Sequence, residues 1–311
     1  MINIKNTNLM VSQLCMGGCP LGGYGWGVVE KTDLINAVQT AVDSGINFFD
    51  TADTYGLGES EKTLGEALGS RKNDVVITTK FGVRVENGKT TYDNSREYIF
   101  KAVEGSLKRL NRDYIDLYQV HYRDGKTPLS DVAESLDILV KQGKIRYYGL
   151  SNIHEEDAKE LKEFKTNPFV SFQDEYSLAC RKNERDMIKF RDEFNMTPFT
   201  WGSLGQGILS GKYDKNCKFD SNDRRSRDIY VNFHGEKLLK NLEIVEVLKD
   251  IAKNYNKSVS AVAIRWILDY LKESVVIVGA KSPKQVIQNS EALGWSLNNE
   301  EVKRLEEISK E

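Results

Sequence analysis

Short apolar segments rich in β-branched and aromatic residues alternate along the chain with longer segments whose apolar residues recur at helical spacing. Apolar residues on both faces of a short segment are typical of a strand buried on both sides of a parallel sheet. The pattern predicts eight strands, at residues 12–18, 46–52, 74–80, 114–121, 146–152, 169–176, 197–204 and 274–280.

The segments between these strands have the periodicity of amphipathic helices. Residues 34–42 carry apolar side chains on one helical face, and Gly45 follows where a left-handed cap residue belongs. Ser95 is a typical N-cap before a second apolar stripe over residues 99–110, and a third stripe covers residues 132–140. Each strand is therefore predicted to lead into a helix.

Parallel strands joined by helical crossovers can close on themselves. The alternation predicts an α/β fold, a (β/α)8 TIM barrel formed as a single domain by residues 1–311. The alternative is an open doubly wound sheet, which would carry a G-x-G-x-x-G motif that this chain lacks. Residues 1–12 are expected to form a β-hairpin that closes the N-terminal mouth, or else a loose terminus. The polar and basic residues 212–235 predict a long functional loop after the seventh strand.

Composition and charge narrow the class of protein. Apolar residues make up 40% of the chain, and 44 Lys and Arg balance 46 Asp and Glu, so no basic surface for nucleic acid is expected. The N-terminus lacks the features of a secretory signal, and the uncharged residues 7–29 include six glycines and a proline, which argues against a membrane span. We expect a cytoplasmic protein without nucleic-acid or membrane partners.

The four cysteines predict neither a disulfide scaffold nor a metal site. In a chain without a secretory signal they are expected to be reduced. Cys15 and Cys19 are spaced as C-x-x-x-C, and no second Cys/His cluster is present to complete a tetrahedral site. We expect no bound metal, with Cys15 as a buried thiol and Cys19 on a loop.

Polar side chains stand at the ends of three successive predicted strands. Asp50, Lys80 and His121 end the second, third and fourth strands, and Tyr55 follows Asp50 in a glycine-bearing loop. In a parallel barrel these strand ends meet at one mouth, where catalytic groups are found. Each residue alone has an ordinary explanation, such as a solvated charge or a packed tyrosine. The four together indicate a catalytic site.

An ordered series of short motifs is more specific than any single residue. The segments DTADTYGLGESEKTLGEAL, TTKFG, VH, GLSN, QDEYSL and GILSGKY, in this order, resemble those of the aldo-keto reductase family over nearly the whole chain. The resemblance implies a (β/α)8 barrel that binds NADP(H), usually without metal or flavin, and reduces aldehydes or ketones. It also implies that Asp50, Tyr55, Lys80 and His121 match the family's catalytic tetrad.

The chemistry of carbonyl reduction agrees with these roles. Hydride addition leaves negative charge on the carbonyl oxygen, which a proton donor must neutralise. We expect Tyr55 to donate that proton. Because a free phenol has a pKa of about 10, the Lys80 ammonium is expected to lower the pKa of Tyr55. Asp50 would keep Lys80 charged, and His121 would hydrogen-bond the substrate carbonyl.

The resemblance also assigns residues around the nicotinamide and the pyrophosphate. Ser151, Asn152 and Gln173 match the residues that hydrogen-bond the carboxamide, and Trp201 matches an aromatic residue that stacks on the ring. The alternative role of the polar residues is to cap strand ends. Backbone close to the pyrophosphate is expected in the turn formed by Gly202, Ser203, Leu204 and Gly205.

The last part of the chain resembles the family's adenosine-binding segment. Gly279 begins it, Lys281 and Ser282 would face the 2′-phosphate at a helix N-terminus, and Gln285 and Asn289 match adenosine-contacting positions. We expect NADP(H) rather than NAD(H) as the cofactor, although an arginine that some relatives carry at the Gln285 position is absent.

The loops around the mouth carry further candidates. Arg224 and Arg225 could fold over the pyrophosphate, although a basic loop is more often solvated. A small carbonyl substrate is expected to contact Tyr24, Trp26, Tyr55, His121 and the loop of residues 84–92. Aromatic side chains there do not distinguish an aldehyde from a ketone or a sugar.

The sequence contains one alternative catalytic pair and allows one alternative function. Tyr122 and Lys126 form a Tyr-x-x-x-Lys, the catalytic pair of short-chain dehydrogenases, but that pair needs a helix, and the glycine and proline here predict a loop. The alternative function is a regulatory protein that senses nucleotide without appreciable turnover, as channel-associated relatives are thought to do. We expect the reductase, because all four tetrad residues are present.

Overall fold

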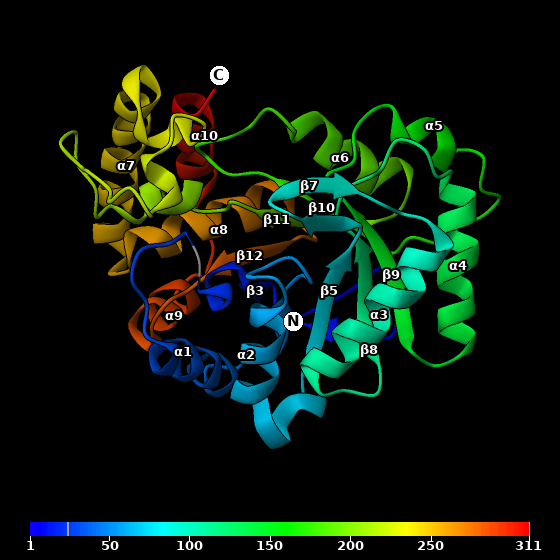
Figure 1. Ribbon diagram of the computed structural model, residues 1–311. Helices are drawn as coiled ribbons and strands as arrows, with labels where there is room; N and C mark the ends of the chain where they lie inside the picture. Colours follow the sequence, from blue (N-terminus) through cyan, green and yellow to red (C-terminus); the bar gives the residue numbers. More distant parts are fainter. Residues whose placement is uncertain (24, 311) are drawn as a thin grey trace.

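A closed barrel of eight parallel strands forms the centre of the computed structural model, which describes residues 1–23 and 25–310 (Figure 1). The strands follow chain order around the barrel, and the last pairs with the first. They are β3 (Leu14–Gly17), β4 (Phe48–Asp50), β5 (Val76–Phe81), β8 (Ile115–Val120), β9 (Ile145–Ser151), β10 (Ser171–Glu175), β11 (Thr197–Trp201) and β12 (Val275–Gly279). All eight predicted strands are confirmed, and the open-sheet alternative is wrong.

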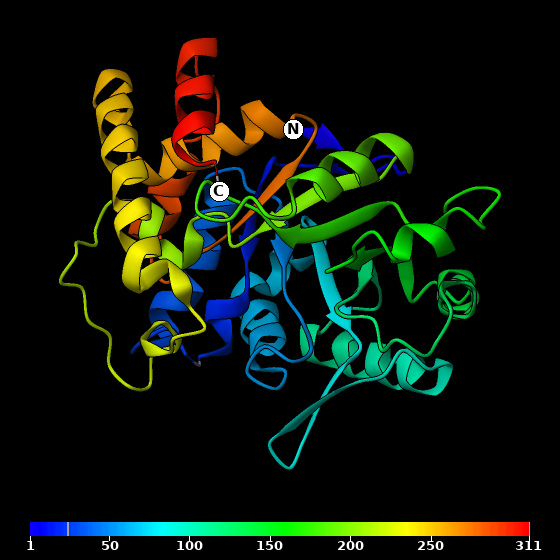
Figure 2. The same ribbon diagram turned by 90° about the horizontal axis from the view of Figure 1, so that it is seen from above.

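Helices surround the barrel (Figures 1 and 2). They are α1 (Lys31–Asp43), α2 (Glu59–Leu68), α3 (Arg96–Leu110), α4 (Leu129–Lys141), α5 (Asp157–Leu161), α6 (Glu184–Glu193), α7 (Gly235–Tyr255), α8 (Val259–Leu271), α9 (Pro283–Ser290) and α10 (Asn299–Ile308). Short 3-10 turns are η1 (Cys19–Gly22), η2 (Gly69–Asn73), η3 (Gly205–Ser210), η4 (Arg224–Ser226) and η5 (Val231–Phe233). Within the described residues, none of the helices is long and apolar enough to cross a membrane.

The predicted apolar stripes face the core. Ser95 caps α3 by accepting a hydrogen bond from Tyr98 N, as its position predicted. The predicted apolar stripe over residues 99–110 of this helix is buried. Val140 is an exception, because 36% of it is exposed near the end of α4. Its assignment to the buried face was wrong.

The N-terminal segment forms the predicted hairpin. Strands β1 (Ile2–Asn3) and β2 (Met10–Val11) pair antiparallel. One apolar cluster joins the hairpin to the strands of the barrel, and it contains Ile4, Leu9, Val11, Cys15, Phe48, Leu117, Val170, Phe199, Val275 and Ile277. The hairpin therefore closes the N-terminal end of the barrel, and the loose-terminus alternative is wrong.

A second hairpin replaces the loop predicted at residues 84–92. Strands β6 (Val83–Glu86) and β7 (Lys89–Tyr92) pair antiparallel and project from the barrel beyond β5 (Figure 2). Asn87 and Gly88 connect them with φ angles of 51° and 74°. Two successive positive φ values are typical of a type I′ turn, which Asn-Gly favours.

The segment of residues 212–235 is folded against the protein. Arg225 is 8% exposed; it donates to both carboxylate oxygens of Asp223 and to Tyr213 Oη at 2.6 Å. Its guanidinium carbon lies 4.4 Å from the centroid of the Phe219 ring. The expectation of a solvated basic loop is wrong for Arg225, because the ion pair and the ring offset its loss of hydration.

Candidate active site

An ion pair between Asp50 and Lys80 lies at the carboxyl end of the barrel. Asp50 is the last residue of β4, and Lys80 lies on the neighbouring β5, with 3% and 0% of each residue exposed. Lys80 Nζ donates to the two carboxylate oxygens at 2.6 and 2.7 Å and to Thr51 O at 3.0 Å. Three acceptors thus satisfy the three ammonium hydrogens, which fixes the orientation of this buried pair.

Tyr55 lies beside the ion pair, on the turn between β4 and α2. Its ring centroid is 5.2 Å from Lys80 Nζ and 5.6 Å from the centroid of the His121 ring. Burial, and then the charge of Asp50, raise the pKa of the Tyr55 phenol well above 10. The expected fall of this pKa below its ordinary value is not found, because burial and the charge of Asp50 outweigh the opposite effect of the Lys80 ammonium, which is itself bonded to Asp50.

Close backbone contact fixes the turn that carries Tyr55. Gly56 has a φ of 61°, and a Cβ at this position would lie 2.3 Å from Gly22 O, so only glycine fits. Ser60 Oγ at the start of α2 donates to Gly18 O at 2.7 Å. The first two βα loops therefore pack directly together, which holds Tyr55 in place.

His121 follows β8 and completes the group of four. It is 8% exposed, and burial, followed by the charge of Lys80, lowers its pKa well below 6.5. The imidazole is therefore neutral at pH 7. Its Nδ1 is buried and has no hydrogen-bond partner among residues 1–23 and 25–310. A buried, unpaired ring nitrogen is costly, so it fits a site where a polar ligand group completes the bond.

The residues predicted around the nicotinamide are bonded to one another and to the tetrad. Asn152 Nδ2 donates to His121 O at 2.9 Å and to Ser151 Oγ at 3.1 Å, and Asn152 Oδ1 accepts from Trp201 Nε1 at 3.2 Å. The last bond orients the indole. Gln173 Nε2 donates to Asp50 Oδ1 at 3.0 Å. The structure thus brings these four residues together at the mouth; their contact with a cofactor stays a prediction.

The turn after β11 is tight, and two of its side chains are buried or partly buried. Gly202 and Gly205 have φ angles of 65° and 54°, and Gly205 N donates to Gly202 O at 2.7 Å. Ser203 is 2% exposed, and its hydroxyl bonds to Thr200. Ser203 is therefore suited to offer a ligand its backbone rather than its side chain. Leu204 is partly buried against the core.

The predicted adenosine segment leads from β12 into α9. Gly279 ends β12, and Ser282 is the N-cap residue of α9. Lys281 N donates to Gln285 Oε1 at 2.8 Å, and Lys281 Nζ donates to Trp26 O at 2.5 Å. Burial lowers the pKa of Lys281, with a further contribution from Arg225. The Lys281 ammonium is thus already in contact with the first βα loop.

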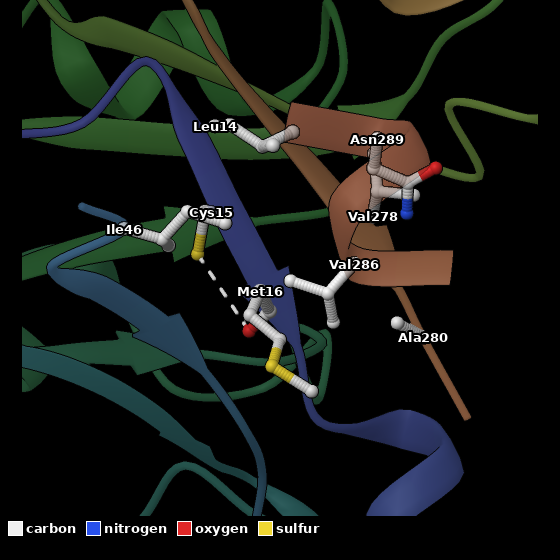
Figure 3. Close-up of a pocket in the computed structure, with 8 residues that line it drawn as sticks. All are labelled: Leu14, Cys15, Met16, Ile46, Val278, Ala280, Val286 and Asn289. Carbon is white, nitrogen blue, oxygen red and sulfur yellow. Dashed lines mark hydrogen bonds between the residues drawn. The ribbon is translucent and has the colours of Figure 1, made fainter. Parts of the chain in front are cut away.

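Asn289 is buried on α9 behind the barrel wall. It lines a cavity of about 10 Å³ with Leu14, Cys15, Met16, Ile46, Val278, Ala280 and Val286 (Figure 3). A cavity with room for at most about one water molecule excludes a nucleotide. The cavity is a packing gap, and the adenosine contact of Asn289 stays a prediction.

Trp26 connects the first βα loop to the long segment. Its Nε1 donates to Cys19 Sγ at 3.3 Å, and its ring lies 6.5 Å from that of Tyr230, edge to face. Cys19 belongs to η1, whereas Cys15 is fully buried as predicted. The other predicted substrate residue of this loop, Tyr24, lies outside the described residues.

Some residues near the site were missed from the sequence. One of them is Tyr122, which stacks on His121 with a centroid distance of 5.1 Å and lies 5.4 Å from Tyr92, a member of the segment 84–92 already expected at the mouth. Gln119, a polar residue in the fully buried β8, bonds to Gln173; its polarity within an apolar strand was the available signal. Residues 122–126 form no helix, which confirms the loop predicted there.

The described part of the chain holds no group of three or more His, Cys, Asp or Glu side chains arranged to bind a metal ion. Its polar site consists instead of the acid, the phenol, the ammonium and the imidazole at the mouth. These features define a (β/α)8-barrel protein with a polar site at the carboxyl ends of its strands.

The chain belongs to the aldo/keto reductase family, whose model matches residues 13–310. It is 34% identical over 309 residues to the aldo-keto reductase YhdN of Bacillus subtilis, covering 98% of this chain and 92% of that protein. It is 33% identical to a probable voltage-gated potassium channel subunit beta of Oryza sativa, covering 94% and 90%. The structure of the glycerol dehydrogenase AKR11B4 from Gluconobacter oxydans superimposes with a TM-score of 0.89 at 33% identity, covering 99% of this chain and 94% of that one.

Proposed function

We propose that this protein is an NADP(H)-dependent oxidoreductase that reduces the carbonyl group of a small aldehyde, ketone or sugar to an alcohol. The observation that supports this most directly is the Asp50–Lys80 ion pair placed beside Tyr55 and His121 at one mouth. The family supplies the reaction class, and the relatives' names include a glycerol dehydrogenase.

Each of the four side chains has a distinct part in the proposed reaction. Tyr55 holds its proton at neutral pH and gives it up when negative charge develops on the carbonyl oxygen, since an alkoxide is a much stronger base than a phenolate. His121, as a neutral imidazole, donates a hydrogen bond to the same oxygen and orients the carbonyl. Lys80, held by Asp50, offsets the negative charge left on Tyr55.

The cofactor supplies the hydride when it is bound. Ser151, Asn152 and Gln173 would hold its carboxamide, and Trp201 would cover the face of the nicotinamide ring. The fit is supported by the unpaired buried Nδ1 of His121 and by the hydrogen bond that fixes the indole of Trp201. Lys281 would bind the 2′-phosphate, which favours NADP(H) over NAD(H).

Loss of absorbance at 340 nm tests the proposed function. Purified protein mixed with NADPH and a panel of aldehydes, ketones and sugars is expected to consume NADPH with at least one of them. The rice channel subunit among the relatives favours a second candidate, a nucleotide-sensing regulatory subunit with the same barrel. Tight NADPH binding without turnover of any carbonyl would support that alternative and contradict the reductase.

Replacing Lys281 with alanine is expected to weaken NADPH binding by about tenfold or more, because a charge-assisted hydrogen bond to phosphate is lost. NADH binding should weaken much less, since NADH has no 2′-phosphate. Some loss is expected for both nucleotides, because the bond from Lys281 Nζ to Trp26 O is also removed. Fluorescence titration with each nucleotide measures the two effects.

Lys284→Ala provides the matched control. Lys284 lies on α9 three residues further on and is exposed. Its replacement removes the same charge without touching Trp26, and is expected to leave the ratio of the two dissociation constants close to that of the wild type. An equal loss of affinity for both nucleotides in Lys281→Ala would remove Lys281 from the 2′-phosphate site.

A further inference from the structure

A buried hydrogen-bond chain connects the catalytic ion pair to Gln119 in the barrel interior. Gln119 lies on β8 and is 0% exposed; Gln173 lies on β10 and is 2% exposed. Gln173 Nε2 donates to Asp50 Oδ1 at 3.0 Å and to Gln119 Oε1 at 3.2 Å. Both hydrogens of the Gln173 amide are therefore used inside the protein.

Gln119 also forms hydrogen bonds with backbone and hydroxyl groups. Gln119 Nε2 donates to Leu150 O and to Ser171 Oγ, each at 3.4 Å, and Thr78 Oγ1 donates to Gln119 Oε1 at 3.0 Å. Every donor and acceptor of the Gln119 side chain thus has a partner. A buried side chain whose polar atoms are all bonded in this way is held in one arrangement.

Two groups that can only accept hydrogen bonds determine which way each amide faces. Leu150 O is a carbonyl, so it must be met by the NH2 of Gln119, which turns Gln119 Oε1 toward Gln173. The ionised Asp50 must likewise be met by the NH2 of Gln173. Both constraints leave Gln173 Oε1 as the free end of its amide, and no donor in the described residues bonds to it.

Gly149 makes this contact between non-adjacent strands possible. It lies on β9, between the strands of Gln119 and Gln173, and pairs with Gln119 in the register. A Cβ on Gly149 would lie 2.3 Å from Ser171 Oγ and 3.3 Å from Gln119 Nε2. Because Gly149 has no side chain, Gln119 on β8 has room to form hydrogen bonds with residues of β10 across β9.

We propose that Gln119 is a positioning residue for the nicotinamide. It keeps the NH2 of Gln173 on Asp50, so that Gln173 Oε1 is the group offered to the cofactor and accepts a hydrogen bond from the carboxamide NH2. The inference rests on the proposed function, in which Gln173 contacts the carboxamide. It adds that cofactor recognition and the support of Asp50 use opposite ends of one amide.

The test compares NADPH with its 3-acetylpyridine analogue, which keeps the carbonyl oxygen but lacks the NH2 group. Fluorescence titration of the wild type is expected to show tighter binding of NADPH, by about two- to tenfold for one hydrogen bond. In Gln119→Met, which keeps the length of the side chain but not its hydrogen bonds, Asp50 alone still holds the NH2 of Gln173, so the amide is held in its orientation less firmly. The preference for NADPH is then expected to fall, but by less than this factor, because one of the two constraints on the amide remains.

Two further variants separate positioning from general damage to the core. Gln119→Glu keeps an acceptor oxygen toward Gln173 and is expected to retain the preference, although a buried charge lowers its melting temperature. Thr78→Val removes another hydrogen bond of Gln119 but leaves Leu150 O, which fixes the orientation of the Gln119 amide. This variant should also retain the preference. If Gln119 has a merely structural role, its replacement should weaken the binding of NADPH and of the analogue equally.

The outcomes distinguish this inference from the function on which it rests. NADPH binding with the same preference in the wild type and in Gln119→Met overturns the positioning role alone. Failure of the wild type to bind NADPH overturns it together with the proposed function. A preference that is reduced in Gln119→Met and retained in Gln119→Glu and Thr78→Val supports it.

Discussion

Replacing Tyr55 with phenylalanine is expected to lower kcat for carbonyl reduction by about 10²- to 10⁴-fold, the usual contribution of a positioned general acid. The change removes one hydroxyl and keeps the ring, which packs edge to face with His121. Binding of NADPH should therefore change little. Steady-state rates at 340 nm, with the NADPH dissociation constant measured separately, test both parts of the prediction.

The pH dependence of the wild type gives a second test of the same residue. Because burial and Asp50 raise the pKa of Tyr55 well above 10, the proton donor stays in its active form as pH rises through the neutral and mildly alkaline range. We therefore expect no loss of kcat/KM from this group below pH 10.

Tyr147→Phe is the matched control for Tyr55→Phe, since the phenol of Tyr147 bonds to Asn8 at the other end of the barrel. Near wild-type rates in Tyr55→Phe would contradict its role.

The barrel could be predicted because its information is local and repeated. Each strand is a short run buried on both faces, as Ile115–Val120 shows, and each is followed by a helix with one apolar face. The β6–β7 hairpin was missed although Asn87-Gly88 is a strong turn signal. Its strands are mostly exposed and polar, so they lack the alternation by which strands are recognised.

The residues at the mouth could be predicted because strand order fixes which ends meet. Asp50, Lys80 and His121 end successive strands, and closing the barrel brings them together. The raised pKa of Tyr55 could not be predicted, because it depends on the burial of the phenol and on the nearby charge of Asp50. Nor could the burial of Arg225, which depends on aromatic residues that meet it only after the long segment folds. Distances between side chains from different loops leave no pattern in the sequence.

Replacing Lys80 with methionine is expected to destabilise the protein by about 3–5 kcal/mol and to abolish measurable carbonyl reduction. The substitution leaves the Asp50 carboxylate 3% exposed without its cation and with Gln173 as its remaining side-chain donor. Urea unfolding of the wild type and of the variant measures the loss of stability, and steady-state rates at 340 nm measure the loss of activity.

Two variants separate the cost of an unpaired charge from the loss of a lysine. In Asp50→Asn with Lys80→Met both charges are absent, so most of the stability should return while reduction stays abolished, because no ammonium remains beside Tyr55. Lys62→Met removes a lysine whose side chain is 57% exposed and which pairs with Glu59 on α2, and it should change stability by at most about 1 kcal/mol. Equal destabilisation by Lys80→Met and Lys62→Met would mean that the buried pair does not stabilise the barrel. Wild-type activity in the double variant would mean that the pair does not support proton donation by Tyr55.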